Sequence, residues 1–373
     1  MKTVKFTQVL KFSENLVKVD KPEEERYVTV LLYGRGVIER EIKEGKVPVA
    51  FTGYKAHAGQ LIISTINARN GAAGIIPAEL EGAVVSKDFP LFDIDHECVD
   101  EQYLLYYLWS DSFIHKAEQN SFGATMPRLH VKPFLNMQMR LPALSEQKRR
   151  AHTLCHVESL LNTQRHLLTK LDELVKSRFV EMFGDPMTNP KGYPCYTVGD
   201  IIEFQGGSQP DKKYFEYVPS KDNIRLIQIR DYKSDKYITY IPRAMAKRFC
   251  TADDIMIGRY GPPIFQILKG IEGSFNVALM KATPKQGNRE FIREFLKQDC
   301  LLEYLEGLSQ RTAGQDGIQM DKLKAYPFPY PPIALQDRFA AFVAEVDKSK
   351  LAVKQSLEKL ETLKKSLMQE YFG

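Results

Sequence analysis

The chain has 373 residues, 43% of them apolar and 11% aromatic, which is enough for two or three domains with buried cores. It contains no apolar run of the roughly 18 residues that a membrane-spanning helix requires, and its first residues lack the apolar stretch of a signal peptide. The net charge of +5 mildly favours a polyanionic partner, and five widely spaced cysteines without a C-x-x-C pair argue against zinc knuckles and disulfide frameworks, so we expect a reduced, cytoplasmic protein.

The first 140 residues predict a globular domain of mixed secondary structure. Runs of β-branched and aromatic residues predict strands at Phe6–Phe12, Tyr27–Tyr33 and Gln60–Ile66. A turn-rich loop, NARNGAAG, follows the third of these strands. The aromatic and leucine-rich stretch Gln102–Gln119 predicts one buried helix.

Residues 141–184 predict a single long helix. Its apolar residues alternate at spacings of three and four, which indicates a narrow seam suited to one partner helix. The seam residues are Leu154, Val157, Leu161, Leu168 and Leu171. The stretch has no interior glycine or proline, and Gly184 followed by Asp185-Pro186 predicts its end. About 36 helical residues would form a rod of roughly 55 Å.

Residues 185–330 repeat the order of elements in the first domain. Ile224–Ile229 predicts a strand, Asp254–Ile257 another, and Phe291–Leu305 a buried helix. The offset between the two domains drifts, which places insertions in loops. The second domain is therefore expected to share the fold of the first and to differ from it in its loops.

The final segment, residues 331–373, predicts a second long helix that repeats the first. Residues 330–373 align with 141–184 without a gap at an offset of 189, and identical pairs include Gln147/Gln336, Lys170/Lys359, Leu174/Leu363, Ser177/Ser366 and Glu181/Glu370. The seam residues here are Val343, Val346, Leu357, Leu360 and Leu367. The predicted fold is of the mixed α/β (α+β) class: two globular domains related by a pseudo-twofold repeat and separated by two long antiparallel coiled-coil helices.

Three groups of segments together resemble the specificity (S) subunit of type I restriction–modification enzymes over the whole length of the chain. They are LPALSEQKRR…LDELVKSRFVEMFGDP in the middle, PPIALQDRF…LEKLETLKKSL at the end, and the paired segments DIMIGRYG and LEGA within the globules. The resemblance implies a DNA sequence-specificity subunit whose two target-recognition domains each bind half of a split target in double-stranded DNA. It also implies that the paired helices set the spacing of the two halves.

The resemblance further implies a set of partners and no chemistry in this chain. Two methyltransferase (M) subunits, which bind S-adenosylmethionine and methylate adenine at N6, would dock on the helices. Restriction/motor (R) subunits, which use ATP and Mg, would complete the complex. The chain itself would carry no catalytic residue, no metal and no cofactor, and it would not contact a membrane.

Candidate DNA-binding residues lie on the predicted loops. Arginine recognises guanine, Asn and Gln recognise adenine, and Lys, Ser and Thr hold phosphates. In the first domain the candidates are Lys55, His57, Asn67, Arg69, Asn70 and Arg128. In the second domain they are Arg230, Lys233, Arg259, Tyr260, Gln266, Arg311 and Gln315. For each residue alone a solvated loop side chain is a competing interpretation, but equivalent loops of the repeat carry the set.

Other interpretations remain open at this stage. A two-headed protein-interaction adaptor with a coiled-coil core would also explain the helices. Asp211 with Asp231 and Lys233 matches the spacing of a nuclease motif, which often arises by chance. His152, Cys155 and His156 have metal-like spacing on one helix face, but no acidic residue completes a site. Gly261-Pro262-Pro263-Ile264 lacks both outer residues of a methyltransferase tetrad, and the chain has no P-loop motif.

Overall fold

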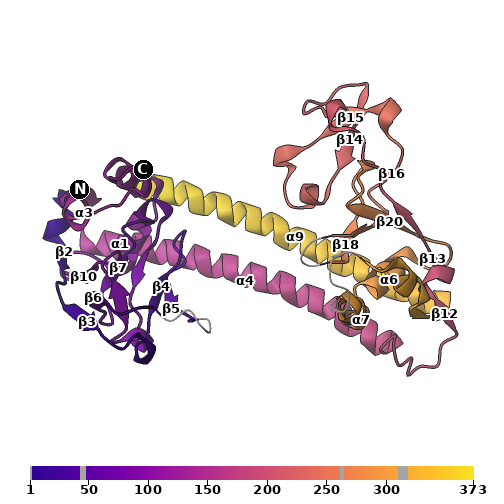
Figure 1. The fold of residues 1–373 in the computed structure, drawn as a ribbon, viewed down its shortest axis with the longest axis horizontal. Coiled ribbons are helices and arrows are strands. Elements are labelled where there is room, and N and C mark those ends of the chain that lie inside the picture. Colours follow the sequence, from indigo (N-terminus) through magenta and orange to yellow (C-terminus); the bar gives the residue numbers. More distant parts are fainter. Residues whose placement is uncertain (1, 43–47, 261–263, 310–317) are drawn as a thin grey trace. The chain divides into compact units, whose positions relative to one another are not determined.

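The computed structural model describes residues 2–42, 48–260, 264–309 and 318–373. The chain divides into two compact units, which we call the first and the second unit. The first unit consists of Met1–Arg165 and Lys354–Gly373, and the second consists of His166–Val353. Each unit contains one globule together with parts of two long helices, α4 (Leu144–Phe183) and α9 (Ile333–Phe372) (Figure 1).

The globule of the first unit is built from four small sheets. One has the order β2-β10-β7-β8, with bounds Leu10–Phe12, Leu91–Ile94, Leu61–Ile63 and Ala73–Ile75. A second has the order β3-β6-β9, with bounds Leu16–Val19, Phe51–Lys55 and Val84–Ser86. Two pairs complete the set: β4 (Val28–Val30) with β5 (Val37–Glu39), and β1 (Lys2–Lys5) with β11 (Gln138–Leu141). The last pair brings the two ends of the globule together next to the start of α4.

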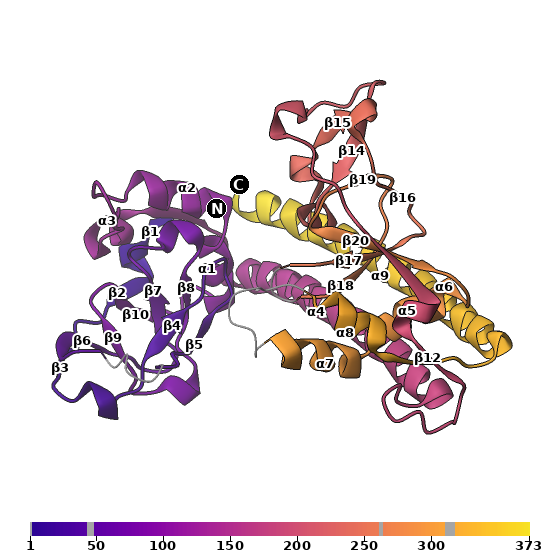
Figure 2. The same ribbon diagram turned by 45° about the vertical axis from the view of Figure 1, so that its right-hand side comes forward.

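The globule of the second unit repeats the central sheet of the first. Its sheet β13-β20-β17-β18 has the bounds Ile202–Gly206, Leu279–Pro284, Ile255–Gly258 and Gln266–Lys269. A further sheet, β15-β14-β19-β16, has the bounds Tyr240–Pro242, Asn223–Ile227, Gly273–Phe275 and Phe249–Cys250 (Figure 2). The pair β12 (Cys195–Thr197) and β21 (Pro327–Pro329) again joins the two ends of the globule. Two short helices, α5 (Val198–Ile201) and α8 (Met320–Ala325), flank these strands.

The aromatic stretch predicted as one buried helix forms two. Helix α1 (Glu101–Leu108) ends before Ser110, which has an extended backbone and caps α2 (Asp111–Gln119) by accepting a hydrogen bond from Phe113 N. The second unit breaks its helix at the corresponding place, between α6 (Arg289–Leu296) and α7 (Asp299–Ser309). The prediction of a single helix was therefore wrong in both units, and the repeat extends to the break itself.

Several predicted strands are shorter than expected. The stretch Phe6–Phe12 begins with a 3-10 turn over Phe6–Gln8, and only β2 is extended. Strand β4 covers only the middle of the predicted strand Tyr27–Tyr33, because the chain turns directly after it. Local propensity gave the position of these strands, whereas their ends depend on hydrogen bonds to distant segments.

The two long helices pair antiparallel within each unit. In the first unit, Arg150 Nη1 on α4 donates to Tyr371 O on α9 at 3.2 Å, and Glu158 pairs with Lys364 at 2.6 Å. In the second unit, the rings of Phe179 and Phe339 lie 5.6 Å apart. The start of one helix thus meets the end of the other. Together with the repeated sheet order, this pairing confirms the predicted fold class.

Each globule shares its apolar core with its segments of the long helices. In the first unit, the core contains Leu154 of α4 together with Phe6, Tyr103 and Phe113. Phe134 of α3 (Val131–Asn136) belongs to the same core. Phe291, Phe295 and Phe328 in the second unit pack with Phe179 and Phe339. These large buried rings supply non-directional attraction that holds globule and helices together.

Candidate nucleic-acid interface and helix surfaces

The loop between β7 and β8 carries three predicted site residues of the first unit. Asn67 directly precedes a short 3-10 turn, Ala68–Asn70, and Asn70 Nδ2 donates to Asn67 Oδ1 at 3.2 Å. Arg69 lies between them, partly exposed, and forms no ion pair with any residue in the described part of the chain. The turn closes at Gly71, whose φ of 64° is costly for other residues. The sequence thus fixes a tight loop that presents one cation and two amides.

Two other candidates of the first unit, His57 and Arg128, already pair with acidic residues. His57 Nδ1 lies 2.8 Å from Glu81 Oε1, and Ala58 N donates to Glu81 Oε2 at 2.6 Å. The Ala58 N–H and then the His57 ring hold the pKa of Glu81 below its usual range. Arg128 Nε donates to Asp88 Oδ1 at 3.0 Å. Lys55, at the end of β6, is exposed.

The candidates of the second unit fall into two groups. Arg230 and Lys233 lie on and after a 3-10 turn, Ile229–Tyr232, that follows β14, and Arg230 Nη2 donates to Thr239 Oγ1 at 3.0 Å. Arg259 follows β17 directly and its guanidinium lies 5.3 Å from the centre of the exposed ring of Tyr260.

Gln266 starts β18 opposite Gly258, so the hairpin places it beside Arg259 and Tyr260. The structure brings these three residues to one end of the β17–β18 hairpin. Arg311 and Gln315 lie outside the described residues.

The nuclease interpretation fails on the burial of Asp231. Its side chain is fully enclosed, and Oδ2 accepts a hydrogen bond from Gln228 N at 3.1 Å. Burial raises the pKa of Asp231 above its usual range. Asp211 caps a separate turn at Lys212–Tyr214. Asp231 Oδ2 is engaged by Gln228 N and lies near Arg225 Nε, so Asp231 has the position of a structural cap.

Neither a metal site nor a membrane segment is found in the described residues. Within the described part of the chain, no three His, Cys, Asp or Glu side chains come together in a way that could bind a metal ion. His152, Cys155 and His156 are all exposed on α4. No helix among the described residues combines the length and the apolar character needed to cross a membrane.

The predicted seam residues face the helix pair or a globule core. Leu154, Val157 and Leu161 on α4, and Val343 and Val346 on α9, are buried. Leu168, Leu171, Leu357, Leu360 and Leu367 are partly buried. None of the ten is exposed, and charged residues flank them on both helices.

A second helix face is exposed in both copies of the repeat and is identical in sequence. On α4 it consists of Lys170, Leu174, Ser177 and Glu181, at spacings that place all four on one face. On α9 the corresponding residues are Lys359, Leu363, Ser366 and Glu370, and all are exposed. Leu174 and Leu363 each leave 46% of their surface exposed. We call these two sets the repeated faces.

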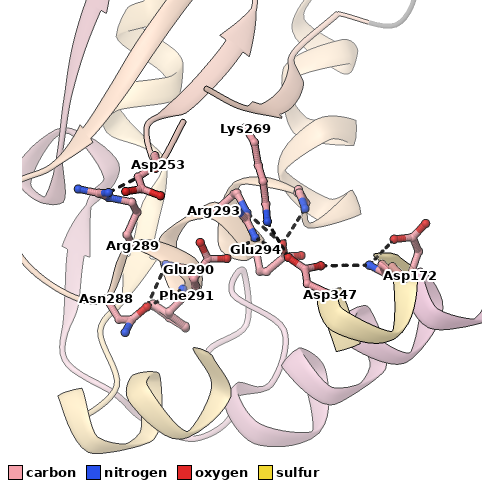
Figure 3. A network of polar contacts seen from close by, with 12 residues as sticks. Asp172, Asp253, Lys269, Asn288, Arg289, Glu290, Phe291, Arg293, Glu294 and Asp347 are labelled. Carbon is pink, nitrogen blue, oxygen red and sulfur yellow. Dashed lines mark hydrogen bonds and ion pairs between the residues drawn. The ribbon is translucent and has the colours of Figure 1, made fainter. Parts of the chain in front are cut away.

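A buried charge network, which the sequence pattern did not predict, joins the second globule to the helices. Arg293 on α6 is only 5% exposed and contacts Glu290, Glu294 and Asp347. Asp347 on α9 also accepts a hydrogen bond from Lys269 Nζ at 2.7 Å (Figure 3). The corresponding positions in the first unit are Leu105 and Tyr106, which are buried and carry no charge.

The family assignment comes from a model of the type I restriction modification DNA specificity domain. This model matches residues 1–173 and again residues 190–363, one copy for each half of the repeat. The chain belongs to this family. The two matches confirm the resemblance seen in the sequence and account for the gap-free repeat of the helices.

Two curated relatives, both type I restriction enzyme specificity subunits, match shorter stretches of this chain. The MjaIX specificity subunit of a type I restriction enzyme from Methanocaldococcus jannaschii is 24% identical over 177 residues, which is 39% of this chain and 41% of the relative. The MjaVIII specificity subunit from the same organism is 27% identical over 103 residues, 28% of this chain and 24% of the relative. The matches thus span less than half the length of these relatives.

Solved structures share the fold over the whole chain. A chain from a study of complex assembly and conformational transition of the type I R-M system aligns with a TM-score of 0.57 and 17% identity, covering 100% of this chain and 97% of that one. The type I restriction-modification S subunit from M. genitalium also aligns with a TM-score of 0.57, with 14% identity and coverage of 100% and 96%. At these sequence identities the similarity shows a shared fold alone.

Proposed function

We propose that this chain is the non-catalytic DNA sequence-specificity subunit of a type I restriction–modification complex. Each globule binds one half of a bipartite target in double-stranded DNA. One observation carries the proposal: the family model matches twice, over two globules that share the order of their central sheet but differ in their loops. A shared frame with unlike loops suits two different half-sites.

The loops of the two units offer different chemistry to DNA. The first unit presents Asn67, Arg69 and Asn70 on one tight turn, a mixture of amides and one cation. The second presents Arg259, Tyr260 and Gln266 at the end of one hairpin. Both sets carry an arginine and at least one amide, the groups that pair best with guanine and adenine, but they differ in order and only the second includes an aromatic ring, so each loop presents its own pattern to DNA.

The repeated faces support docking of two copies of one partner. These residues are exposed in both copies, so apolar packing within the chain does not explain why they are identical. A partner that binds one face would find the same leucine, lysine and glutamate on the other. We assign these faces to two M subunits, which would bring S-adenosylmethionine, while R subunits would bring ATP and Mg, all in the cytoplasm.

The decisive experiment compares the chain alone with the complex that it forms with a methyltransferase subunit from the same host. Methylation-aware sequencing of host DNA, with and without the gene for this chain, should give one bipartite adenine-methylated sequence that disappears with the gene. Duplexes with that sequence should bind the complex with a steep dependence on salt, since phosphate contacts release counterions. Methyl transfer by this chain alone would contradict the proposal. Loss of the gene without any change in methylation would favour the protein-interaction adaptor.

A further inference from the structure

Tyr33 combines two properties that the fold does not require. Its φ is +61°, in the left-handed region where side chains other than glycine are strained, and its side chain is 75% exposed. It lies in the turn between β4 and β5. A strained residue persists only when something else favours that side chain at that place.

The other described non-glycine residues with positive φ have structural explanations. Asn189 uses its side chain to donate to Tyr193 O and to accept from Tyr193 N. Phe265 is buried in the core of the second unit. The Tyr33 ring is exposed to solvent, and its hydroxyl forms no hydrogen bond with any residue that the structure describes. Glycine would satisfy the backbone at position 33 better than tyrosine.

The turn that carries Tyr33 is firmly built. Tyr33 N donates to Asn70 O at 2.8 Å, and Gly34 N donates to Gly71 O at 3.2 Å. A Cβ on Gly34 would come within 2.7 Å of the Trp109 ring, and Trp109 Nε1 is itself fixed by Ala73 O at 3.1 Å. These contacts hold Tyr33 against the loop of Asn67 and Asn70, although 34 or more residues separate the two segments in the sequence.

The charges around the turn favour a polyanion. Arg35, two residues after Tyr33, and Arg69, on the adjacent loop, are cations without an ion pair in the described residues. Tyr33 and Arg35 also line a cleft that contains three acidic residues. Two of these, Glu158 and Glu361, already pair with Lys364 and Arg165.

We propose that Tyr33 is a DNA-contacting residue of the first globule, with its ring against a base or sugar and with Arg35 and Arg69 on the flanking phosphates. The inference rests on the proposed function and adds residues that the sequence pattern did not indicate. Exposed aromatic rings flanked by cations are a common means of holding nucleic acid, because rings gain from contact with base and sugar faces and cations from phosphates. The backbone strain at Tyr33 is then explained by the contact of its ring with DNA.

The variant Tyr33→Gly separates binding from folding. Glycine relieves the backbone strain, so the thermal midpoint of unfolding should equal or exceed that of the wild-type chain. In the assembled complex with the methyltransferase, affinity for the methylated bipartite duplex should fall by about tenfold. Tyr33→Phe should keep the affinity, since the ring and not the hydroxyl makes the contact. Ile38→Ala, at an exposed apolar residue of the same hairpin, is the matched control and should also keep it.

Each outcome decides the inference. A Tyr33→Gly complex that assembles and binds the duplex with wild-type affinity would overturn it while leaving the proposed function intact. Loss of the methyltransferase from the purified Tyr33→Gly complex would overturn it in favour of a protein contact. If the wild-type complex itself shows no salt-dependent duplex binding, the proposed function fails first, and the inference fails with it.

Discussion

Gln336 makes in the second unit the hydrogen bonds that Gln147 makes in the first. Gln147 Oε1 accepts from Asp100 N at 2.9 Å, and its Nε2 donates to Pro142 O at 2.9 Å. Gln336 Oε1 accepts from Asn288 N at 2.8 Å, and its Nε2 donates to Pro331 O at 2.8 Å. Both side chains are completely buried. Each therefore joins the start of a long helix to the residue that caps the first buried helix of its globule.

Replacing either glutamine with leucine should destabilise its unit by about 1–3 kcal/mol, because a buried N–H and at least one buried carbonyl lose their partners. Leucine keeps much of the side-chain volume, so the loss reflects hydrogen bonding rather than a cavity. Urea unfolding of Gln147→Leu and Gln336→Leu would measure it. Gln355→Leu, at an exposed position of α9, should change stability by less than about 0.5 kcal/mol. Equal effects of all three variants would count against the interpretation.

The Arg293 network predicts that replacing Arg293 alone destabilises the second unit more than replacing both Arg293 and Glu294. Arg293→Leu removes the buried cation that contacts Glu290, Glu294 and Asp347, leaving Glu294 with Lys297 at 2.6 Å, and breaking a buried ion pair typically costs about 3–5 kcal/mol. The double variant Arg293→Leu/Glu294→Leu removes both charges, and leucine is the residue found at the position of Arg293 in the first unit, Leu105. It should recover a substantial part of that loss, since apolar replacements of buried ion pairs are often well tolerated.

Thermal unfolding of the two single variants and the double variant gives the coupling free energy directly. Leu105→Ala provides the comparison in the first unit, where the loss should come from the cavity alone and amount to about 2–5 kcal/mol. A double variant that is less stable than Arg293→Leu would show that the charges, and not the packing, dominate this junction.

The repeat, the long helices and their antiparallel pairing could be predicted because each depends on a local pattern. The spacing of the apolar residues predicted the seam of each long helix, and the gap-free alignment of the two copies predicted that the helices pair antiparallel. The break at Ser110 was missed because a capping hydroxyl competes with strong helix formers on both sides. Arg293 was missed because a charged residue is expected on the surface unless distant partners enclose it. Tyr33 was missed because its neighbour Asn70 is joined to it only by a long-range backbone hydrogen bond.

Asp347 should make the stability of the second unit fall in acid. Burial acts to raise the pKa of Asp347, but the Lys269 ammonium, with Arg293 and Lys350, outweighs burial and leaves the pKa below its usual range. A carboxyl group with a lowered folded pKa stabilises the protein above the pKa of the unfolded chain, about 4, and loses that contribution as the pH falls through the folded value. Asp347→Asn removes the contribution at every pH.

Urea unfolding of the wild-type chain and of Asp347→Asn should therefore give curves that differ near neutral pH and converge toward about pH 3. Lys18→Ala, which removes an exposed ion pair with Asp20 in the first unit, is a control and should have little effect at neutral pH. A difference between wild type and Asp347→Asn that stays constant across this range would show that the amide disturbs packing and not charge.

Arg259 should affect only one half of the DNA target. It follows β17 at the end of the hairpin, where Tyr260 and Gln266 also lie, and its guanidinium is only weakly held by Val277 O at 3.5 Å. If the second globule recognises a base through this residue, Arg259→Ala removes a contact worth about 1–3 kcal/mol and relaxes the base choice at one position. Lys233→Ala should weaken binding to all duplexes alike, because a phosphate contact does not depend on sequence. Methylation-aware sequencing of hosts that express each variant distinguishes the two effects, and an unchanged recognition sequence for Arg259→Ala would remove this residue from the interface.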